Sequence, residues 1–190
     1  MKHYFRTACS VLLIIITADV ARADDTAAAP TPTPGCTIFL GGNGSRFKNA
    51  EFNQRWINVN RAAWTAAIQK LYHLHYRVEP LFSEGPDPQE SLQDVYKKMR
   101  EKQCDQVIQL SHELTISSEP NAIPHLSLDV LVFHLEKDPN GQSAKIVGDY
   151  QHKYPFVLTK EVMENLKISD VGETIATDVD AAHVLRARGP

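Results

Sequence analysis

The sequence predicts a single α/β domain built on a mixed β-sheet, with helices packed on the sheet. In the first half of the chain, short apolar runs alternate with helical apolar spacing, which is typical of parallel strands joined by helical crossovers. In residues 126–135 one face is apolar from the start, and Leu131, Phe133 and Leu135 make the second face apolar as well, as in a strand at the middle of a sheet. Residues 144–154 alternate in polarity after a turn sequence, so they predict a strand that returns beside it.

The first residues have the pattern of a secretory signal. Lys2 and Arg6 give a positive start, and residues 8–18 are apolar but too short to cross a bilayer. Ala21, Arg22 and Ala23 then fit the small-x-small cleavage pattern, so we expect a mature chain that begins at Asp24.

Three segments follow from this pattern. Residues 1–23 are the expected signal peptide, and residues 24–35 form a Pro/Thr/Ala-rich spacer with too few apolar side chains to fold. Residues 36–190 form one globular domain. The sequence therefore predicts a periplasmic or secreted protein without a transmembrane segment in its mature chain.

The overall charge argues against nucleic acid as a partner. The chain has 20 Lys and Arg against 23 Asp and Glu, a net charge of −3, and the signal removes more basic than acidic residues. Affinity for nucleic acid comes mainly from clustered Lys and Arg that neutralise phosphates. The expected partner is instead an envelope protein or a polysaccharide.

The cysteines predict a disulfide. Cys9 leaves with the signal, and it lies at the head of the apolar run, where lipid attachment is not expected. Cys36 and Cys104 remain as an even pair in an oxidising compartment, with two buried thiols as the alternative. Neither belongs to a CxxC pair, so we expect no zinc or redox site.

Residues 36–40 predict a short buried strand, which the glycine-rich segment from Gly41 to Ser45 should end. A glycine-rich loop after a first strand can bind phosphate, but this loop lacks the Lys-Ser/Thr ending of a P-loop. A plain turn is the favoured interpretation.

Residues 46–76 have helical apolar spacing. The segment divides into a short first piece, either a helical turn or a loop, and a main helix capped by Asn58 or Asn60. The predicted apolar face of the main helix consists of Trp64, Ile68, Leu71, Tyr72 and His75, with Ala63 and Ala67 beside it.

Residues 77–82 predict a strand that Pro80 confines to an edge of the sheet. Asp87 and Pro88 then start a second helix, with a cap followed by a proline at the first helical position. Its predicted buried stripe is Leu92, Val95, Tyr96 and Met99.

Residues 107–116 predict a long strand with one polar face. His112 lies on its apolar side, so we expect a core histidine with satisfied hydrogen bonds, while Glu113 points the other way.

The end of the chain predicts a hairpin and two helices. Asp138 to Gly141 form the turn, Thr159 caps a short helix that runs to residue 167, and the last helix spans 169 to about 185. The predicted inward row of the returning strand is Ala144, Ile146, Gly148, Tyr150, His152 and Tyr154.

The predicted order is β-α-β-α-β-β-β-α, with a parallel first half and an antiparallel hairpin in the second half. In a unit with two crossovers the first and third strands are commonly neighbours. Their amino-terminal ends would bring Cys36 and Cys104 together.

This architecture, with the Asp-Pro-Asn-Gly turn and the residues up to Gly148, resembles a periplasmic superfamily. That superfamily includes the amino-terminal domain of the Tol-system translocation protein, the periplasmic part of the curli secretion pore subunit and the lipoprotein activators of peptidoglycan synthases. The resemblance implies an assembly or scaffolding factor without catalytic residues. The chain departs from it in lacking a lipid-attachment cysteine.

The first functional hypothesis is an exported non-enzymatic envelope protein, such as an assembly or secretion accessory factor. It would bind a partner through an exposed sheet edge or through the loops at 41–46 and 117–125. The sequence has no HExxH or GxSxG motif and no nucleophilic cysteine with a base, so no catalytic residue and no cofactor are expected.

Two alternatives stay open. A metal-binding protein or periplasmic metalloenzyme would use histidines on adjacent strands, and the candidates are His112, His125, His134 and His152. A secreted toxin or its neutralising partner also fits the size and the export signal.

Overall fold

The computed structural model describes residues 35–84, 88–116, 122–137 and 144–186. The predicted signal peptide, nearly all of the spacer, Asp87, the turn from Asp138 to Gly141 and residues 117–121 lie outside the described residues. The elements follow the chain as β1 (Cys36–Gly44), α1 (Ala50–His73), β2 (Arg77–Phe82), α2 (Pro88–Lys102), β3 (Gln106–Thr115), β4 (His125–Lys137), β5 (Ala144–Val157), α3 (Lys160–Asn165) and α4 (Ile168–Ala181).

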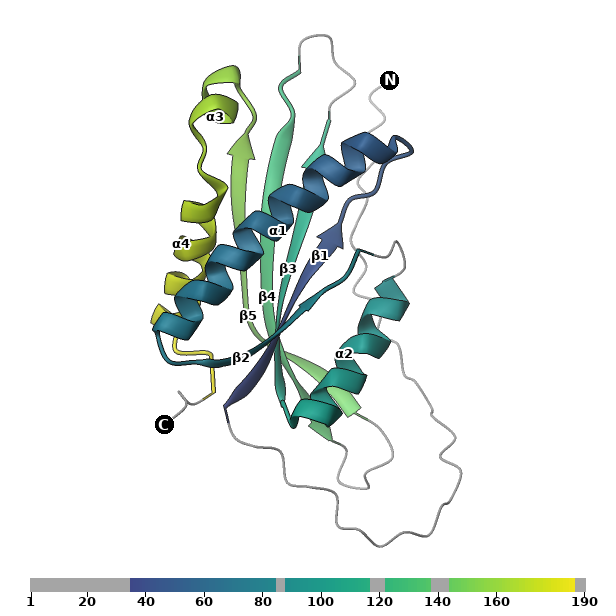
Figure 1. The fold of residues 1–190 in the computed structure, drawn as a ribbon, viewed down its shortest axis with the longest axis vertical. Coiled ribbons are helices and arrows are strands. Elements are labelled where there is room, and N and C mark those ends of the chain that lie inside the picture. The colour runs from purple at the N-terminus through teal and green to yellow at the C-terminus, as the bar shows by residue number, and fades with distance from the viewer. Residues whose placement is uncertain (1–34, 85–87, 117–121, 138–143, 187–190) are drawn as a thin grey trace, which may run out of the picture.

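The five strands form one mixed sheet in the order β2-β1-β3-β4-β5 (Figure 1). β1 pairs in parallel with both β2 and β3, whereas β4 runs antiparallel to both β3 and β5. The predicted fold class and the predicted adjacency of the first and third strands are therefore confirmed.

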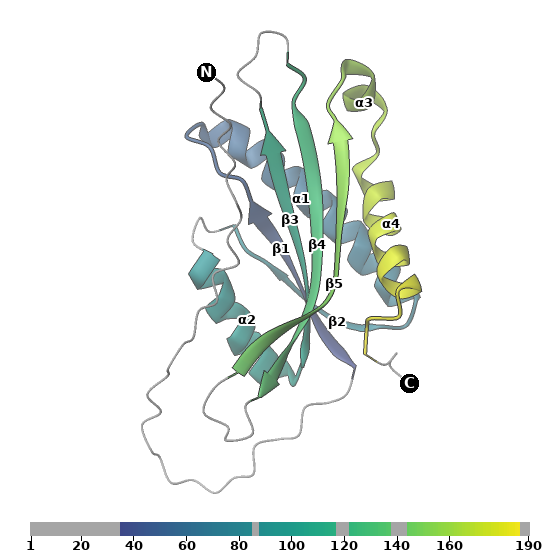
Figure 2. The ribbon, with the colours of Figure 1, turned by 180° about the vertical axis from the view of Figure 1, so that it is seen from behind.

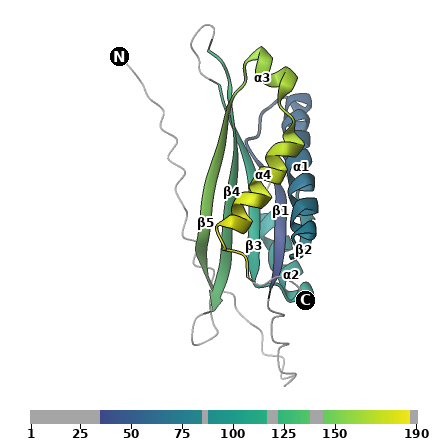
Figure 3. The same cartoon turned by 90° about the vertical axis from the view of Figure 1, so that its left-hand side faces the viewer.

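Helices cover both faces of this sheet. α1 and α4 lie on one face (Figure 3), where Phe39, Leu110 and Val130 pack against Ile68 and Ile175. α2 lies on the opposite face. Seen from behind, the upper parts of β3, β4 and β5 stand in front of α1 (Figure 2).

The second, smaller core lies under α2. Val95 and Met99 of the helix pack there against Ile38 and Val107 of the sheet. Alternate residues of β1 thus enter different cores, because successive side chains of a strand point to opposite faces. This explains why the run from Cys36 to Leu40 is apolar throughout.

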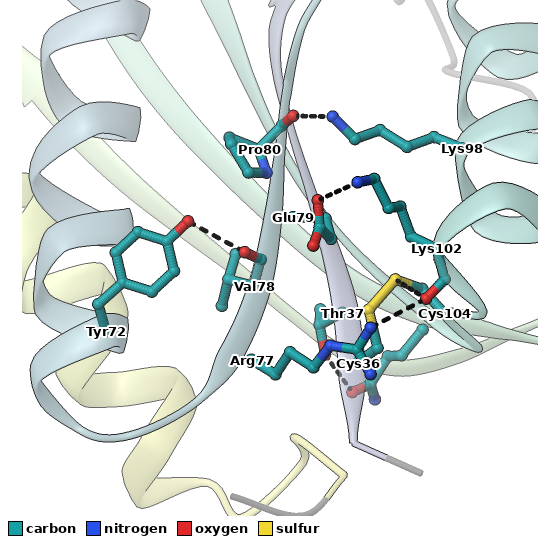
Figure 4. The surroundings of a disulfide bond; sticks show 11 residues. Cys36, Thr37, Tyr72, Arg77, Val78, Glu79, Pro80, Lys98, Lys102 and Cys104 are labelled. Atoms are coloured by element: carbon teal, nitrogen blue, oxygen red, sulfur yellow. Dashed lines mark hydrogen bonds and ion pairs between the residues drawn. A yellow bond between two sulfur atoms is a disulfide. The ribbon is translucent and has the colours of Figure 1, made fainter. Parts of the chain in front are cut away.

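The expected disulfide between Cys36 and Cys104 is present (Figure 4), with Cα atoms 4.5 Å apart. Cys36 opens β1, and Cys104 lies just before β3, so the parallel pairing of these strands brings the two residues together. The bridge joins two residues that are 68 positions apart in the sequence, with α1, β2 and α2 between them.

α1 is one continuous helix, so the predicted division of 46–76 is wrong. Asn49 caps it, with its side chain accepting from the Phe52 N–H at 2.8 Å. Asn58 and Asn60 are not caps. Trp64 is half-buried on the predicted face, whereas Tyr72 and His75 are exposed.

The expected break at Gly41 is also wrong, because β1 continues to Gly44. Its register against β3 shifts between Leu40 and Asn43, which marks a bulge. Gly42 has a φ of +92°, and a Cβ there would lie 1.9 Å from the Ser83 carbonyl oxygen. The glycines therefore bend a strand around a close neighbour instead of ending it.

A second bulge changes the face of β5. The register against β4 pairs Val132 with Tyr150 but Phe133 with Gly148, so Asp149 is the extra residue. The predicted inward row is correct at Tyr150 and Tyr154, which pack against the core. It is wrong below the bulge, where Ile146 is 48% exposed.

The carboxyl-terminal helices follow the prediction closely. Thr159 caps α3, its Oγ1 accepting from the Val162 N–H at 3.2 Å. α4 ends at Ala181, four residues earlier than expected, and buries Ile175 and Val179.

The contact between α1 and α4 generates a stability prediction at Gly172. A Cβ there would lie 2.2 Å from the Ala63 carbonyl oxygen and 2.9 Å from the Ala66 Cβ. We expect Gly172→Ala to force the helices apart and to lower the free energy of unfolding by about 1–2 kcal/mol, despite the better helix propensity of alanine. Urea unfolding measures this.

The matched control is Glu173→Ala at the next, exposed position, which should change the unfolding free energy by less than about 0.5 kcal/mol. A Gly172→Ala protein as stable as the parent would contradict the close packing.

Candidate functional site

The structure spreads the four candidate histidines over the sheet. His112 pairs with Leu128, His125 with Thr115, His134 with Gln106 and His152 with Val130. The positions of His112 and His134 are six residues apart along β3, about 20 Å at the usual strand rise. Within the described residues, no three His, Cys, Asp or Glu side chains come together to hold a metal ion.

His112 belongs to a buried polar cluster beside the β1 bulge. Asn60, wholly buried in the middle of α1, accepts from the Gly42 N–H at 2.9 Å through Oδ1. Its Nδ2 donates to the Leu110 carbonyl at 3.2 Å and lies 3.4 Å from His112 Nδ1. Asn60 therefore joins α1 to the irregular part of the sheet.

The cluster provides a hydrogen-bond partner for only one of the two ring nitrogens of His112. The residue is a core histidine as predicted, 2% exposed, but its Nε2 has no hydrogen-bond partner among the described residues. Burial lowers the pKa of His112 to about 4, and the positive charge of Arg46 acts in the same direction. His112 is therefore neutral at physiological pH.

The glycine-rich segment is engaged within the fold. The Gly42 N–H donates to Asn60, and the Ser45 N–H donates to the His112 carbonyl at 2.8 Å. The Gly42 carbonyl accepts from the Arg46 guanidinium at 2.8 Å. The N–H groups of Gly42 and Ser45 are thus already used, and they are not available to cradle a phosphate.

A second polar cluster surrounds His134. Its Nδ1 lies 2.8 Å from Asp149 Oδ1, and Asp149 Oδ2 accepts from Gln106 Nε2 at 3.1 Å. Gln106 also donates to the Val184 carbonyl at 2.8 Å and accepts from the Arg186 N–H at 3.2 Å. This cluster ties the segment after α4 to the sheet, which is a structural role.

The β2 edge of the sheet is closed by side chains (Figure 4). The Val78 carbonyl accepts from the Tyr72 hydroxyl at 3.0 Å, and the Pro80 carbonyl accepts from Lys98 Nζ at 2.5 Å. Pro80 itself has no N–H. These features are typical of an edge protected against another strand.

The opposite edge is formed by β5, a strand of 14 residues. The directions of its peptide groups follow from the pairing of the strands, beginning at β3. The His112 carbonyl and the Leu114 N–H bond to Ser45, so the peptide groups of these residues point toward β1. The peptide groups of the alternate residues of β3 point toward β4, since alternate residues of a strand bond to opposite neighbours.

The same alternation continues across β4. The peptide groups of Ser111 point toward its partner Asp129. Those of Leu128 and Val130 therefore point toward β5, where their partners are Tyr154 and His152. Gln151 and Lys153 lie between these partners on β5. Their N–H and C=O groups therefore point outward, away from the sheet, and both side chains are exposed.

Side chains do not close this edge as they close β2. Among the described residues, no side chain hydrogen-bonds to the peptide groups of Gln151 or Lys153. Lys153 could guard the edge, but its Nζ lies 2.9 Å from Asp129 and 3.5 Å from Glu113 on the neighbouring strands. The hydrogen bond to Asp129 raises the pKa of Lys153.

Sequence reasoning missed Asn60, His134 with Asp149, and the outward groups of β5. Asn60 was interpreted as a possible helix cap, whereas an asparagine within the helical apolar spacing of residues 46–76 could also have indicated a buried polar contact. The Asp149 bulge has no such signal. The β5 edge depends on strand order, and the sequence indicated only that some edge is exposed.

Comparisons with known proteins found distant structural likeness. No protein-family model matches the chain, and a search of curated proteins found no match. Among solved structures, the chain is similar to a dodecameric PelC variant from Paraburkholderia phytofirmans, with 11% identity, a TM-score of 0.39, and 81% of this chain and 89% of that chain covered. The hypothetical protein CT253 from Chlamydia trachomatis has 10% identity and a TM-score of 0.37, with 80% and 96% covered.

A minor lipoprotein from Acinetobacter baumannii gives 12% identity and a TM-score of 0.26, with 80% of this chain and 96% of that chain covered. Likeness at this level carries no argument about what the chain binds. Across the described residues, no helix combines the length and the apolar character needed to cross a membrane.

The buried His112 generates a prediction about pH. An unfolded histidine has a pKa of about 6.5, so the unfolded state binds the proton more readily than the folded state between pH 6.5 and 4. The stability that a neutral His112 contributes is complete above pH 6.5 and is lost as the pH falls toward 4, by about 3 kcal/mol in all. Urea unfolding at several pH values measures this loss.

His112→Gln should flatten the dependence over this window, because glutamine does not titrate. His152→Gln, at an exposed histidine of the same sheet, should leave the dependence unchanged. An equal loss of stability in the parent and in His112→Gln would contradict the burial of a neutral His112.

Proposed function

We propose that the chain is an exported, non-enzymatic protein of the cell envelope that acts by contact. Its partner is a protein with an extended segment, which binds by adding a strand to the outer edge of β5. The observation that carries this proposal is the difference between the two sheet edges.

Strand addition requires a free row of backbone donors and acceptors. The outward groups of Gln151 and Lys153 meet this requirement in the upper half of β5. The free row is limited to these two residues, because Pro155, the next outward residue, has no N–H. Val157, 43% exposed at the end of the strand, adds an apolar contact. The protected β2 edge supports the assignment, because there Tyr72 and Lys98 occupy the carbonyls that a strand would need.

Export is supported by the signal pattern at 1–23 and by the disulfide. Structural disulfides persist in oxidising compartments and are rare in the cytosol. The Cys36–Cys104 bridge joins the first strand to the start of the third, so it belongs to the framework of the domain. This framework fits a protein that works in the periplasm.

The proposal is tested with one substitution on the open edge. Gln151→Pro removes an outward N–H without removing any bond to β4, because the peptide groups of Gln151 face away from β4. Immobilised parent protein and variant are exposed to envelope extract. We expect the parent to retain a discrete protein partner and the proline variant to retain at least about tenfold less.

Gln151→Ala is the matched control, because it removes the same side chain and keeps the N–H. It should retain the partner at the parent level. Equal retention by the proline variant, with its fold intact by circular dichroism, would show that binding does not use the β5 edge.

A further inference from the structure

We infer that the segment after α4, residues 182–186, holds β5 in its bulged register, and that release of this segment lets the lower part of β5 slide by one residue. The slide removes the bulge at Asp149 and lengthens the open row of peptide groups on the β5 edge. The inference rests on the proposed function, because it concerns the regulation of the same edge. Residues 182–186 are called the strap.

The strap is bound to the first residue of β3. Gln106, which is wholly buried, donates to the Val184 carbonyl at 2.8 Å and accepts from the Arg186 N–H at 3.2 Å. Leu185 lies between these contacts and is buried in the larger core. Arg186 also pairs with Asp105 at 3.0 Å. The strap therefore engages both the donor and the acceptor of one amide group, and these contacts fix the orientation of that amide.

The same amide reaches the bulge. Gln106 Nε2 donates to Asp149 Oδ2 at 3.1 Å, and Asp149 Oδ1 lies 2.8 Å from His134 Nδ1. Gln106 and His134 are paired, so they share the face of the sheet that carries α1 and α4. The Asp149 carboxylate lies on this face as well. The strap, Gln106 and the bulge thus form one connected set of hydrogen bonds.

A β5 strand without the bulge loses the bonds of Asp149. If the pairing of Val132 with Tyr150 continued regularly, Asp149 would lie opposite Phe133. Phe133 packs in the smaller core under α2, so the Asp149 side chain would also point to that face. It would then be on the opposite face from His134. The bulge and the hydrogen bonds of Asp149 therefore require each other.

The apolar side chains of β5 do not choose strongly between the two registers. With the bulge, Ile146 is opposite Leu135 and Val147 is opposite His134. Without the bulge, Val147 moves opposite Leu135, and Ile146 turns to the face of α1 and α4. One aliphatic side chain replaces the other, and this second register is the regular alternation that the sequence predicts. The polar contacts of Asp149 therefore decide the register.

The directions of the peptide groups below the bulge follow from β4, which pairs regularly with β3. The peptide groups of Val130 point toward β5, so those of His134 do so as well. The partner of His134 is Val147, whose N–H is therefore bonded to β4. Ile146 and Gly148 lie on either side of Val147, and their peptide groups point outward.

The slide reverses these directions. Without the bulge, the peptide groups of Val147 and Asp149 point outward and continue the row formed by Gln151 and Lys153. Strand addition gains affinity from main-chain hydrogen bonds, so the register with the longer row is the better binder. Because coupling between two equilibria is reciprocal, a bound strand favours release of the strap, and an attached strap weakens binding.

Amide hydrogen exchange of the disulfide-intact protein distinguishes the two registers. In the parent protein, the Val147 amide should be protected and the Ile146 amide should exchange fast. Asp149→Ala removes the carboxylate that joins the bulge to Gln106, and each lost bond to a charged group changes the register equilibrium by roughly tenfold or more. We expect the pattern to reverse, with Ile146 protected and Val147 exchanging at least about tenfold faster than in the parent. General destabilisation would lower both protections instead.

Gln106→Leu tests the strap itself, because leucine has a similar volume but binds neither Val184 nor Arg186. It should reverse the two amides in the same way. The matched control is Lys145→Ala, at an exposed position of the same part of β5. It should leave the protection of both amides within about twofold of the parent.

Retention of the envelope partner tests the regulation of the edge. Immobilised Asp149→Ala should retain at least about threefold more partner than the parent protein, because its open row is longer. Reversed protection without stronger retention would overturn this regulation, and unchanged protection of Ile146 and Val147 in both variants would overturn the whole inference. The proposed function fails separately, when the parent retains no envelope partner, and the exchange pattern then still decides between the two registers.

Discussion

The parallel pairing of β1 with β3 is the contact on which the rest of the structure depends, because it decides which strands become edges. Both strands are buried, and the Cys36–Cys104 bridge fixes their amino-terminal ends. With β1 and β3 adjacent, β2 pairs with the free side of β1. The hairpin then extends the sheet in the other direction, and β5 becomes the last strand.

The two edges that result differ in their chemistry. β2 is short, contains Pro80 and has its outward carbonyls occupied by α1 and α2 through Tyr72 and Lys98. β5 is long, and although it also contains a proline, Pro155, the carbonyl and N–H groups of Gln151 and Lys153 are not occupied by side chains among the described residues. The side chain of Lys153 bonds to Asp129 of the neighbouring strand. Natural sheets commonly protect their edges, and the open part of β5 beside a protected β2 is the basis of the proposed function.

The fold could be predicted because its strands and helices have strong local signals. The apolar run at 126–135 placed β4 inside the sheet, Pro80 placed β2 at an edge, and Thr159 placed the start of α3. These signals are local, and the tertiary structure agrees with them.

The irregular features could not be predicted, because they depend on contacts between distant segments. The bulge of β1 exists because Asn60 and Ser83 meet Gly42 from elsewhere in the chain. The bulge at Asp149 is accompanied by bonds to His134 and Gln106 on two other strands. The pattern of residues 144–154 is compatible with regular alternation throughout, so the exposure of Ile146 had no signal in the sequence.

Amide hydrogen exchange of dilute, monomeric protein tests the central claim of an open β5 edge most directly. The amides of Gln151 and Lys153 should exchange at nearly unprotected rates, while those of His152 and Tyr154, bonded to β4, should exchange slowly. Equal protection along this stretch of β5 would show that its outer edge is already covered, and it would contradict the proposed function.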